Sequence, residues 1–162
     1  MDSEDFDQFV RREAPALVAF VRRVANVGAA QAQDAVQDAT IKAYENWAEI
    51  DHPRAWVRRV AQRAARAEAA RSQDGMLRAV AGGHLVTVHH DPDIAVLHTE
   101  HDQLLQYLAD LPTKQRLVMA WHLDGFDNEE IAEQLSMAPA TVRSNLRHAR
   151  TALSTRLRQS TH

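Results

Sequence analysis

The chain has 162 residues, of which 45% are hydrophobic and 25% charged, so it can build packed cores and stay dissolved. It contains no cysteine, which excludes disulfides, thiolate metal sites and a cysteine nucleophile. The sequence has no apolar run long enough to span a membrane, and its acidic N-terminus lacks the apolar stretch of a secretory signal. We therefore expect a cytoplasmic protein.

The charges are unevenly distributed along the chain. The net charge is −3 and the isoelectric point is near 6.3, which argues against a general coat protein of nucleic acids. Residues 51–72 nevertheless hold six basic and two acidic residues, and residues 140–162 hold five arginines and no acid. Residues 1–50 and 73–113 are acidic. This pattern predicts two local contacts with an anion.

Three helices are expected in the N-terminal part. The first should be interrupted or kinked near Pro15 and stop at Asn26 or Gly28. The second should run from about residue 30 to about 48, and the third should begin at Pro53 and end near 71. Together they would bury a small core. The expected inward residues are Phe6, Phe9, Val10, Leu17, Val21 and Val24, then Ala32, Ala35, Val36, Ala39, Ala43 and Trp47, then Val57, Val60, Ala61 and Ala64.

Two outward faces of these helices have side chains that could bind a partner or an anion. On the second helix, a polar face opposite the small-residue stripe includes one exposed isoleucine, Ile41. An acidic rim around an apolar anchor suits a partner surface, although a solvated helix face is the simpler alternative. On the third helix, a basic face has the spacing i, i+4, i+7. The two sets are Asp34, Gln37, Asp38, Ile41 and Glu45, and Arg59, Arg63 and Arg66.

A linker is expected to follow. Residues 72–98 contain Gly75, Gly82, Gly83 and Pro92 and no long helical stripe. Their LVTV segment alternates like a strand but has nothing to pair with. Five of the nine histidines lie here or just beyond, and His98 and His101 could share a metal. A polar, histidine-rich linker is the better interpretation, because no cysteine or glutamate cluster supports a metal site.

The C-terminal part predicts four more helices. A leucine stripe from Leu104 to Leu111 stops at Pro112, and Thr113 is expected to cap a helix that Gly125 ends. Asp127 is the predicted N-cap of the next helix, where Glu130 would complete a capping box and Phe126 would pack on Ile131. That helix should end by Leu135, and Pro139 should open the last one.

The last two helices form a predicted helix-turn-helix, because only a three-residue turn separates them. The residues expected to face inward are Ile131, Ala132, Leu135, Val142, Leu146 and Ala149, and those facing outward are Ala140, Arg143, Ser144 and Arg147. Spaced arginines on an exposed helix are usually a solvated face. The capped support helix and the tight turn favour DNA binding instead.

These motifs carry a family resemblance. The segment LADLPTKQRLVMAWHLDGFDNEEIAEQLSMAPATVRSNLRHARTAL resembles region 4 of bacterial sigma factors, with its LP…QR, EIA and TVRS elements in the family's order. The segments AQAQDAVQDATIKAYENW and HPRAWVRRVA are similar to region 2. The layout looks like that of the extracytoplasmic-function group. It implies an all-α fold with a region 2 helix bundle in residues 1–71, a flexible linker in 72–98 and a region 4 helix-turn-helix domain in 99–162.

The resemblance implies a role for each surface. An RNA polymerase sigma factor binds core polymerase through the β′ clamp helices and the β flap, and it directs promoter-specific initiation. The implied core-binding residues are Asp34, Gln37, Asp38, Ile41 and Glu45. The implied −10 contacts are Arg59, Arg63, Arg66 and Arg71, and the implied −35 contacts are Arg116, Ala140, Thr141, Arg143, Ser144 and Arg147. An anti-sigma factor is a further implied partner, and the holoenzyme would be found at the nucleoid.

Two departures from the family's pattern bear on these roles. The third helix has Arg63 and Ala67 where members often have Asn and Asp, so −10 specificity does not carry over by residue. The turn has Ser136 and Ala138 in place of the usual Gly and Ser, and a lost N-cap costs typically about 1 kcal/mol.

Other classes of function remain as alternatives. No Gly-rich phosphate loop, GxSxG, HExxH or metal-spaced carboxylate set occurs, so we expect no enzyme, cofactor or metal. A stand-alone helix-turn-helix regulator could use the first domain for dimerisation or sensing. A degenerate sigma fold could merely sequester a partner. Only a sigma factor needs both the acidic face of the second helix and the basic face of the third.

Overall fold

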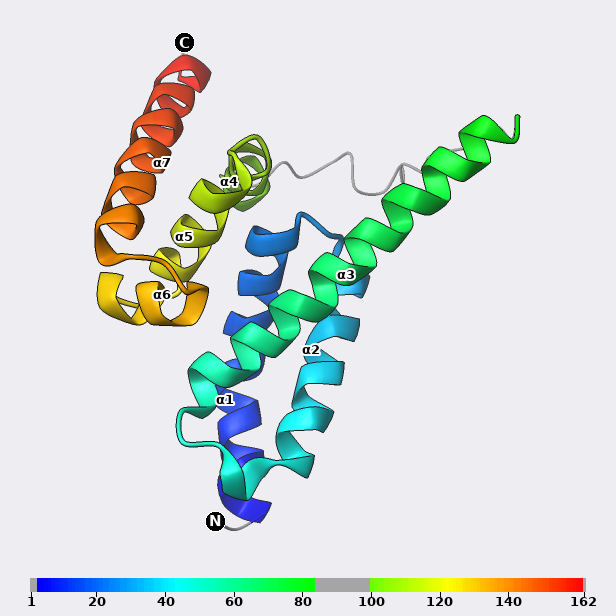
Figure 1. The fold of residues 1–162 in the computed structure, drawn as a ribbon, viewed down its shortest axis with the longest axis vertical. Helices are drawn as coiled ribbons and strands as arrows, with labels where there is room; N and C mark the ends of the chain where they lie inside the picture. The colour runs from blue at the N-terminus through cyan, green and yellow to red at the C-terminus, as the bar shows by residue number, and fades with distance from the viewer. Residues whose placement is uncertain (1–2, 84–99, 162) are drawn as a thin grey trace.

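The computed structural model describes residues 3–83 and 100–161, and within these ranges every regular element is a helix (Figure 1). The elements are α1 (Ser3–Ala25), α2 (Ala29–Glu45), the short 3-10 helix η1 (Trp47–Glu49), α3 (Pro53–Ala81), α4 (Glu100–Ala109), α5 (Thr113–Leu123), α6 (Asn128–Leu135) and α7 (Pro139–Ser160). The all-α class expected from the sequence is confirmed.

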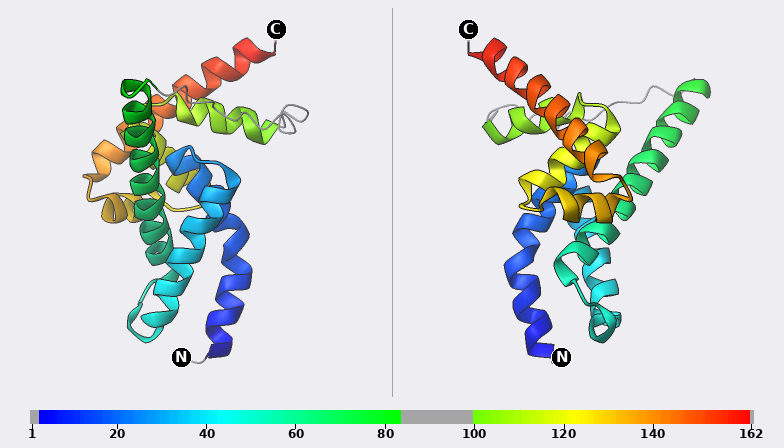
Figure 2. Two further views of the ribbon diagram at one scale, coloured as in Figure 1. Left: turned by 90° about the vertical axis from the view of Figure 1, so that its right-hand side faces the viewer. Right: turned by 60° about the vertical axis from the view of Figure 1, so that its left-hand side comes forward.

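Helices α1, α2 and α3 form an N-terminal bundle, in which they lie side by side (Figures 1 and 2). The predicted alanine stripe of α2 is buried, and Ala61 and Ala65 of α3 are buried as well. Small side chains allow the backbones of neighbouring helices to approach closely. The opposite face of α2 is consequently left outside the bundle.

Helix α1 is continuous through Pro15, so the expected interruption does not occur. Pro15 removes one backbone donor, but it lies on the exposed side of the helix, where water can satisfy the freed carbonyl. Phe9 before it and Leu17 after it are both buried and hold the two halves in one helix. The expected stop is confirmed, because Asn26 has a left-handed backbone with φ 50°.

The second and third helices end at different positions from those expected. Helix α2 stops at Glu45, and Trp47 opens η1, where its ring contacts Phe6 and Phe9 at centroid distances of 5.1 Å. Helix α3 continues to Ala81, ten residues beyond the expected end. Gly75 costs about 1 kcal/mol in a helix interior, but its Ala, Arg, Gln, Met and Leu neighbours favour helix.

The end of α3 projects away from the other helices (Figure 1). The last buried residue of α3 is Ala65, so the final four turns rest on helix propensity rather than on packing. Residues 72–81, expected in the linker, thus belong to a helix. The LVTV segment and His84, His89, His90 and His98 lie outside the described residues.

Helices α4 to α7 form the C-terminal domain, which contains the predicted helix-turn-helix. The Asp127 carboxylate accepts from the Glu130 backbone at 2.8 Å, and the Glu130 side chain accepts from the Asp127 backbone at 2.8 Å, so the capping box is confirmed. Every predicted inward residue of the helix-turn-helix is buried except Leu135, which is half-buried. Thr113 does not cap α5, because Pro112 occupies the N-cap position.

The two parts of the chain share one continuous core, which the sequence did not predict. The indole of Trp121 is fully buried and meets Phe20 of α1 edge-on, with centroids 5.2 Å apart. Its N–H donates to Oε1 of Gln62 on α3 at 2.8 Å. We call this contact of α5 and its following turn with α1 and α3 the interdomain seam.

The turn of the helix-turn-helix gives a stability prediction. Ala138 is the N-cap of α7 and has the extended backbone of a capping residue, with φ −67° and ψ 142°, but no side-chain oxygen. Ala138→Ser should raise the free energy of unfolding by about 1 kcal/mol, because the hydroxyl can accept from a free N–H in the first turn. Urea denaturation would measure it. Ala70→Ser, at an exposed position inside α3, is the matched control and should give no increase.

Candidate functional site

The outer face of α2 is exposed and combines acids with apolar side chains. Ile41 is 53% exposed, and Tyr44, which the sequence analysis did not single out, is 61% exposed. Asp34, Gln37 and Glu45 are also exposed. Asp38 is half-buried and pairs with Lys42 at 2.9 Å. The structure thus brings the five predicted residues onto one side of the helix, opposite its buried alanines.

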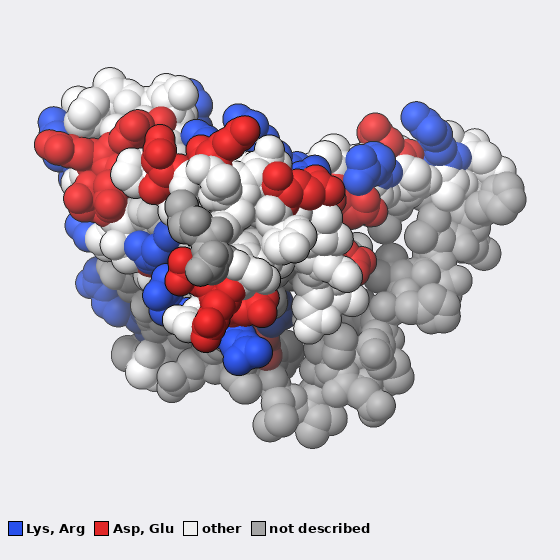
Figure 3. All heavy atoms as spheres, turned by 90° about the horizontal axis from the view of Figure 1, so that it is seen from below, with Lys and Arg blue, Asp and Glu red and all other residues white. Residues whose placement is uncertain are grey.

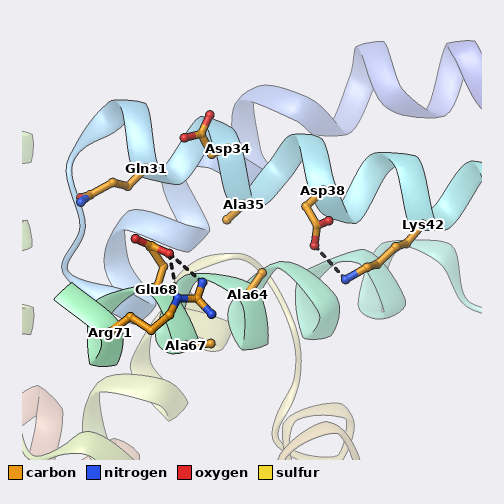
Figure 4. A pocket seen from close by; sticks show the side chains of 9 residues that line it. All are labelled: Gln31, Asp34, Ala35, Asp38, Lys42, Ala64, Ala67, Glu68 and Arg71. Atoms are coloured by element: carbon orange, nitrogen blue, oxygen red, sulfur yellow. Dashed lines mark hydrogen bonds and ion pairs between the residues drawn. The ribbon is translucent and has the colours of Figure 1, made fainter. Parts of the chain in front are cut away.

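A groove of about 500 Å³ runs between α2 and α3 (Figure 4). Its lining residues are Gln31, Asp34, Ala35, Asp38 and Lys42 from α2 and Ala64, Ala67, Glu68 and Arg71 from α3. Arg71 pairs with Glu68 at 2.6 Å. The structure therefore places Arg71 in the same groove as Asp34 and Asp38.

The basic face of α3 lies close to the C-terminal domain. Arg63 and Arg66 are exposed, and Arg59 is half-buried. Arg59 lines a cleft of about 250 Å³ together with Trp56 and the turn before α3. Glu133 and Gln134 of α6 line the same cleft, so α6 lies against the predicted −10 side of the bundle.

Arg58 is the most important residue that sequence reasoning missed. It is fully buried, and its guanidinium contacts the Glu13 carboxylate at 2.9 Å and the Asp124 carboxylate. Helical periodicity could have indicated that Arg58 is buried, because it lies on the same side of α3 as Ala61, Gln62 and Ala65. Nothing in the sequence shows that the stripe beyond the bundle core meets the turn after α5.

Arg54 adds a second contact at the seam. Its guanidinium donates to the backbone carbonyl of Asp124 and lies over the Phe126 ring, 4.2 Å from the centroid. Gly125 between these residues has φ +92°, and a Cβ there would lie 3.4 Å from the Arg54 Nη2 atom. The turn from α5 to α6 is therefore fitted closely against α3.

Helix α7 presents the predicted reading face to the outside. Ala140, Thr141, Arg143 and Arg147 are exposed, and Ser144 is half-buried. Further along α7, the Arg150 guanidinium contacts the Nε2 atom of His122 on α5 at 3.1 Å. Burial lowers the pKa of His122 below its ordinary value, and the charge of Arg150 lowers it further by a smaller amount.

Arg116 is placed apart from the other predicted −35 residues. It lies on α5, is half-buried and has a buried Nε atom without a hydrogen-bond partner. Burial lowers the pKa of Arg116, and the charge of Arg66 on α3 lowers it further by a smaller amount. The structure thus brings Arg116 near Arg66, a predicted −10 residue, through the same seam.

The distribution of surface charge restricts where an anion can approach. Figure 3 shows acidic side chains spread in patches over the face of the molecule seen from below. Such patches repel a phosphate backbone. Among the described residues no cluster of ligands for a metal occurs, and none of the described helices is long and apolar enough to cross a membrane.

Comparison with protein-family models gives two matches along the chain. Residues 9–75 match the model described as Sigma-70 region 2, and residues 101–153 match the one described as Sigma-70, region 4. Together they cover most of the chain. No curated protein sequence matches it significantly.

Two solved structures are similar in fold. One is CnrH in complex with the cytosolic domain of CnrY, with a TM-score of 0.71, 22% identity, and coverage of 98% of this chain and 90% of that one. The other is the sigma factor RpoE in complex with the anti-sigma factor NepR from Bartonella quintana, with a TM-score of 0.72, 22% identity, and coverage of 96% and 98%.

The buried cation at the seam gives a second stability prediction. Arg58→Ala leaves the Glu13 and Asp124 carboxylates without their shared partner, so it should lower the free energy of unfolding by about 3–5 kcal/mol. The neighbouring Arg59→Ala is the control; Arg59 has no ion pair among the described contacts, and we expect a change below about 1 kcal/mol. Equal urea midpoints for the two variants would contradict the role of Arg58.

Proposed function

The chain belongs to the sigma-70 family, as an RNA polymerase sigma factor of the extracytoplasmic-function type that directs promoter-specific initiation, and from this premise we propose how its surfaces divide the work. The observation that carries the proposal is the presence of two exposed faces on one chain, on α2 and on α7. We assign residues 1–71 to core polymerase and the −10 element, 72–98 to a linker that includes the end of α3, and 99–162 to the −35 element. The chain needs no catalytic chemistry of its own for this, and it would work in the cytoplasm and at the nucleoid.

The outer face of α2 is the proposed surface for the β′ clamp helices. Ile41 and the Tyr44 ring, which meets Phe6 edge-on, are both more than half exposed and lie among Asp34, Gln37 and Glu45. A desolvated apolar centre with a polar rim is the usual anatomy of a protein interface. An anti-sigma factor, such as the NepR bound to RpoE in the Bartonella quintana structure, could compete with core polymerase for this face.

The DNA contacts divide between the two domains. The exposed Arg63 and Arg66 suit phosphates and unstacked bases of the −10 strand, where stacking and groove charge supply the affinity. Arg143 and Arg147 suit base edges in the −35 major groove, because they lie in the first half of α7. Arg116 suits a −35 phosphate once the seam has opened.

The first functional prediction concerns core binding. Asp38→Arg combined with Ile41→Arg should weaken binding to core polymerase at least about tenfold, as loss of an interface anchor does. The measurement is a titration of labelled chain with core. Leu157→Arg is the matched control, because Leu157 is 50% exposed and Ile41 is 53% exposed. If the double variant still binds core like the wild type, α2 is not the docking helix.

The second functional prediction concerns promoter reading. Arg143→Ala and Arg147→Ala should each cost roughly 1–3 kcal/mol and relax the preference at one base position. Arg116→Ala should weaken all promoters about equally. Selection from a −35 library in holoenzyme would separate these effects, with Arg158→Ala, exposed near the end of the same helix, as the control. Unchanged selected sequences for both α7 variants would rule out this helix as the reader.

A further inference from the structure

The last turns of α3 carry exposed apolar side chains. Met76 is 45% exposed, Leu77 is 61% exposed and Val80 is 62% exposed. Helical spacing puts all three on one side of the helix, and we call them the α3 apolar tip. Single apolar residues scattered over a surface are normal, whereas a cluster of them within two turns marks an interaction site.

No other described part of the chain covers the α3 apolar tip. The last buried residue of α3 is Ala65, and the end of the helix projects away from the other helices (Figure 1). The helix does not need these side chains for its own stability, because Gln or Lys favours helix about as well as Leu and Met do and better than Val does. A contact with another molecule therefore accounts for them better than the fold of the free chain.

The side chains around the tip argue against nucleic acid as this partner. The positively charged side of α3 ends at Arg66, and helical spacing continues that side through Ala70, Gln73, Leu77 and Val80. None of these four residues is charged, although neutralisation of phosphates supplies most of the affinity of a protein for DNA. Apolar side chains are instead stabilised by burial against an apolar protein surface.

The tip is also too small to hold a second copy of the chain. Stable interfaces bury roughly 800 Å² on each partner, and three partly exposed side chains on one helix supply only a fraction of that area. A contact of this size contributes when the partner is already held elsewhere, because the second contact then forms at a high effective concentration. The tip therefore suits an additional contact within a larger interface.

A larger interface lies close by, on the outer face of α2 that is assigned to core polymerase. Asp34 and Asp38 of that face line the groove between α2 and α3, and Arg71 lines the opposite wall (Figure 4). Leu77 follows Arg71 by six residues, which corresponds to about 9 Å along the helix axis. A partner seated on the outer face of α2 thus has the α3 apolar tip within reach.

We propose that the α3 apolar tip is a second docking contact for core polymerase, in which Leu77 and Val80 pack against an apolar surface beside the one that receives α2. This rests on the proposed assignment of α2 to core polymerase. The tip adds affinity to the α2 contact. It also fixes the orientation of the N-terminal bundle on the polymerase, because two separate contacts restrict a rotation that one contact allows.

The binding test is a titration of core polymerase with the full chain carrying Leu77→Gln and Val80→Gln. Gln keeps the helix propensity, and neither residue packs on the bundle, so the variant should fold like the wild type. We expect the affinity for core to fall about three- to tenfold, as for an apolar contact outside the main anchor of an interface. The matched control combines Asp74→Gln with Arg78→Gln, which alters exposed residues on another side of the same turns and keeps the net charge. It should bind like the wild type.

Cross-linking identifies the molecule that the tip contacts. The chain has no cysteine, so a photoreactive group can be attached at Met76→Cys alone. In holoenzyme bound to promoter DNA, we expect cross-links to a core subunit and none to DNA. Gln159→Cys, at the exposed end of α7, reports the background of the reaction.

Three results would overturn the second contact. The first is an affinity for core that Leu77→Gln and Val80→Gln leave unchanged. The second is cross-linking of Met76→Cys to DNA, which would assign the tip to the promoter. The third is a loss of self-association or of thermal stability in the free variant chain, which would assign the tip to a second copy or to this chain itself.

Failure of the second contact is distinguishable from failure of the proposed function. If Asp38→Arg with Ile41→Arg weakens core binding while the tip variant binds like the wild type, only the second contact is rejected. If the wild-type chain does not bind core polymerase at all, the proposed function is rejected and the second contact with it.

Discussion

The packing of the C-terminal domain against the N-terminal bundle is centred on one buried cation, Arg58. The Arg58 side chain is 1% exposed and is shared between Glu13 of its own bundle and Asp124 of the C-terminal domain. A charge taken out of water costs several kcal/mol, so a guanidinium at this position needs partners on more than one side. Glu13 is available within the bundle, but the second carboxylate comes only with the turn after α5. Burial of Arg58 therefore links the packing of α3 to the position of α6 and α7.

The same constraint explains why the functional faces differ in accessibility. Helix α2 packs inward through four alanines and Val36, so its outer face, with Ile41 and Tyr44, is open to a partner. Helix α3 instead carries both the arginines proposed to contact DNA and the residues of the seam. Core polymerase could therefore engage the free chain first, through α2. Arg59 and Arg116, two of the residues proposed to contact DNA, are half-buried where the two domains meet.

The sequence predicted those parts of the structure that depend on neighbours in the chain. The capping box of α6 involves residues three apart, and the alanine stripe of α2 follows from helical periodicity, so both were predicted correctly. The seam joins Arg58 to a residue 66 positions away, and periodicity shows which side of a helix faces inward without showing what lies there. The extension of α3 was missed for a different reason. Gly75 suggested a break, whereas the summed propensity of the surrounding residues continues the helix.

The composition of the seam suits an arrangement that has to open. Desolvation offsets much of the attraction within a buried ion pair, so Arg58 and Asp124 specify the geometry more than they stabilise it. The apolar part centres on Trp121, which packs edge-on against Phe20. When the seam breaks, Arg58 keeps Glu13, while Asp124 and Arg54 regain water. Opening the seam therefore costs less free energy than a wholly apolar contact would. Binding of a partner to α2, together with a few phosphate contacts, can offset that cost. A wholly apolar seam of the same area would hold the two domains together more strongly.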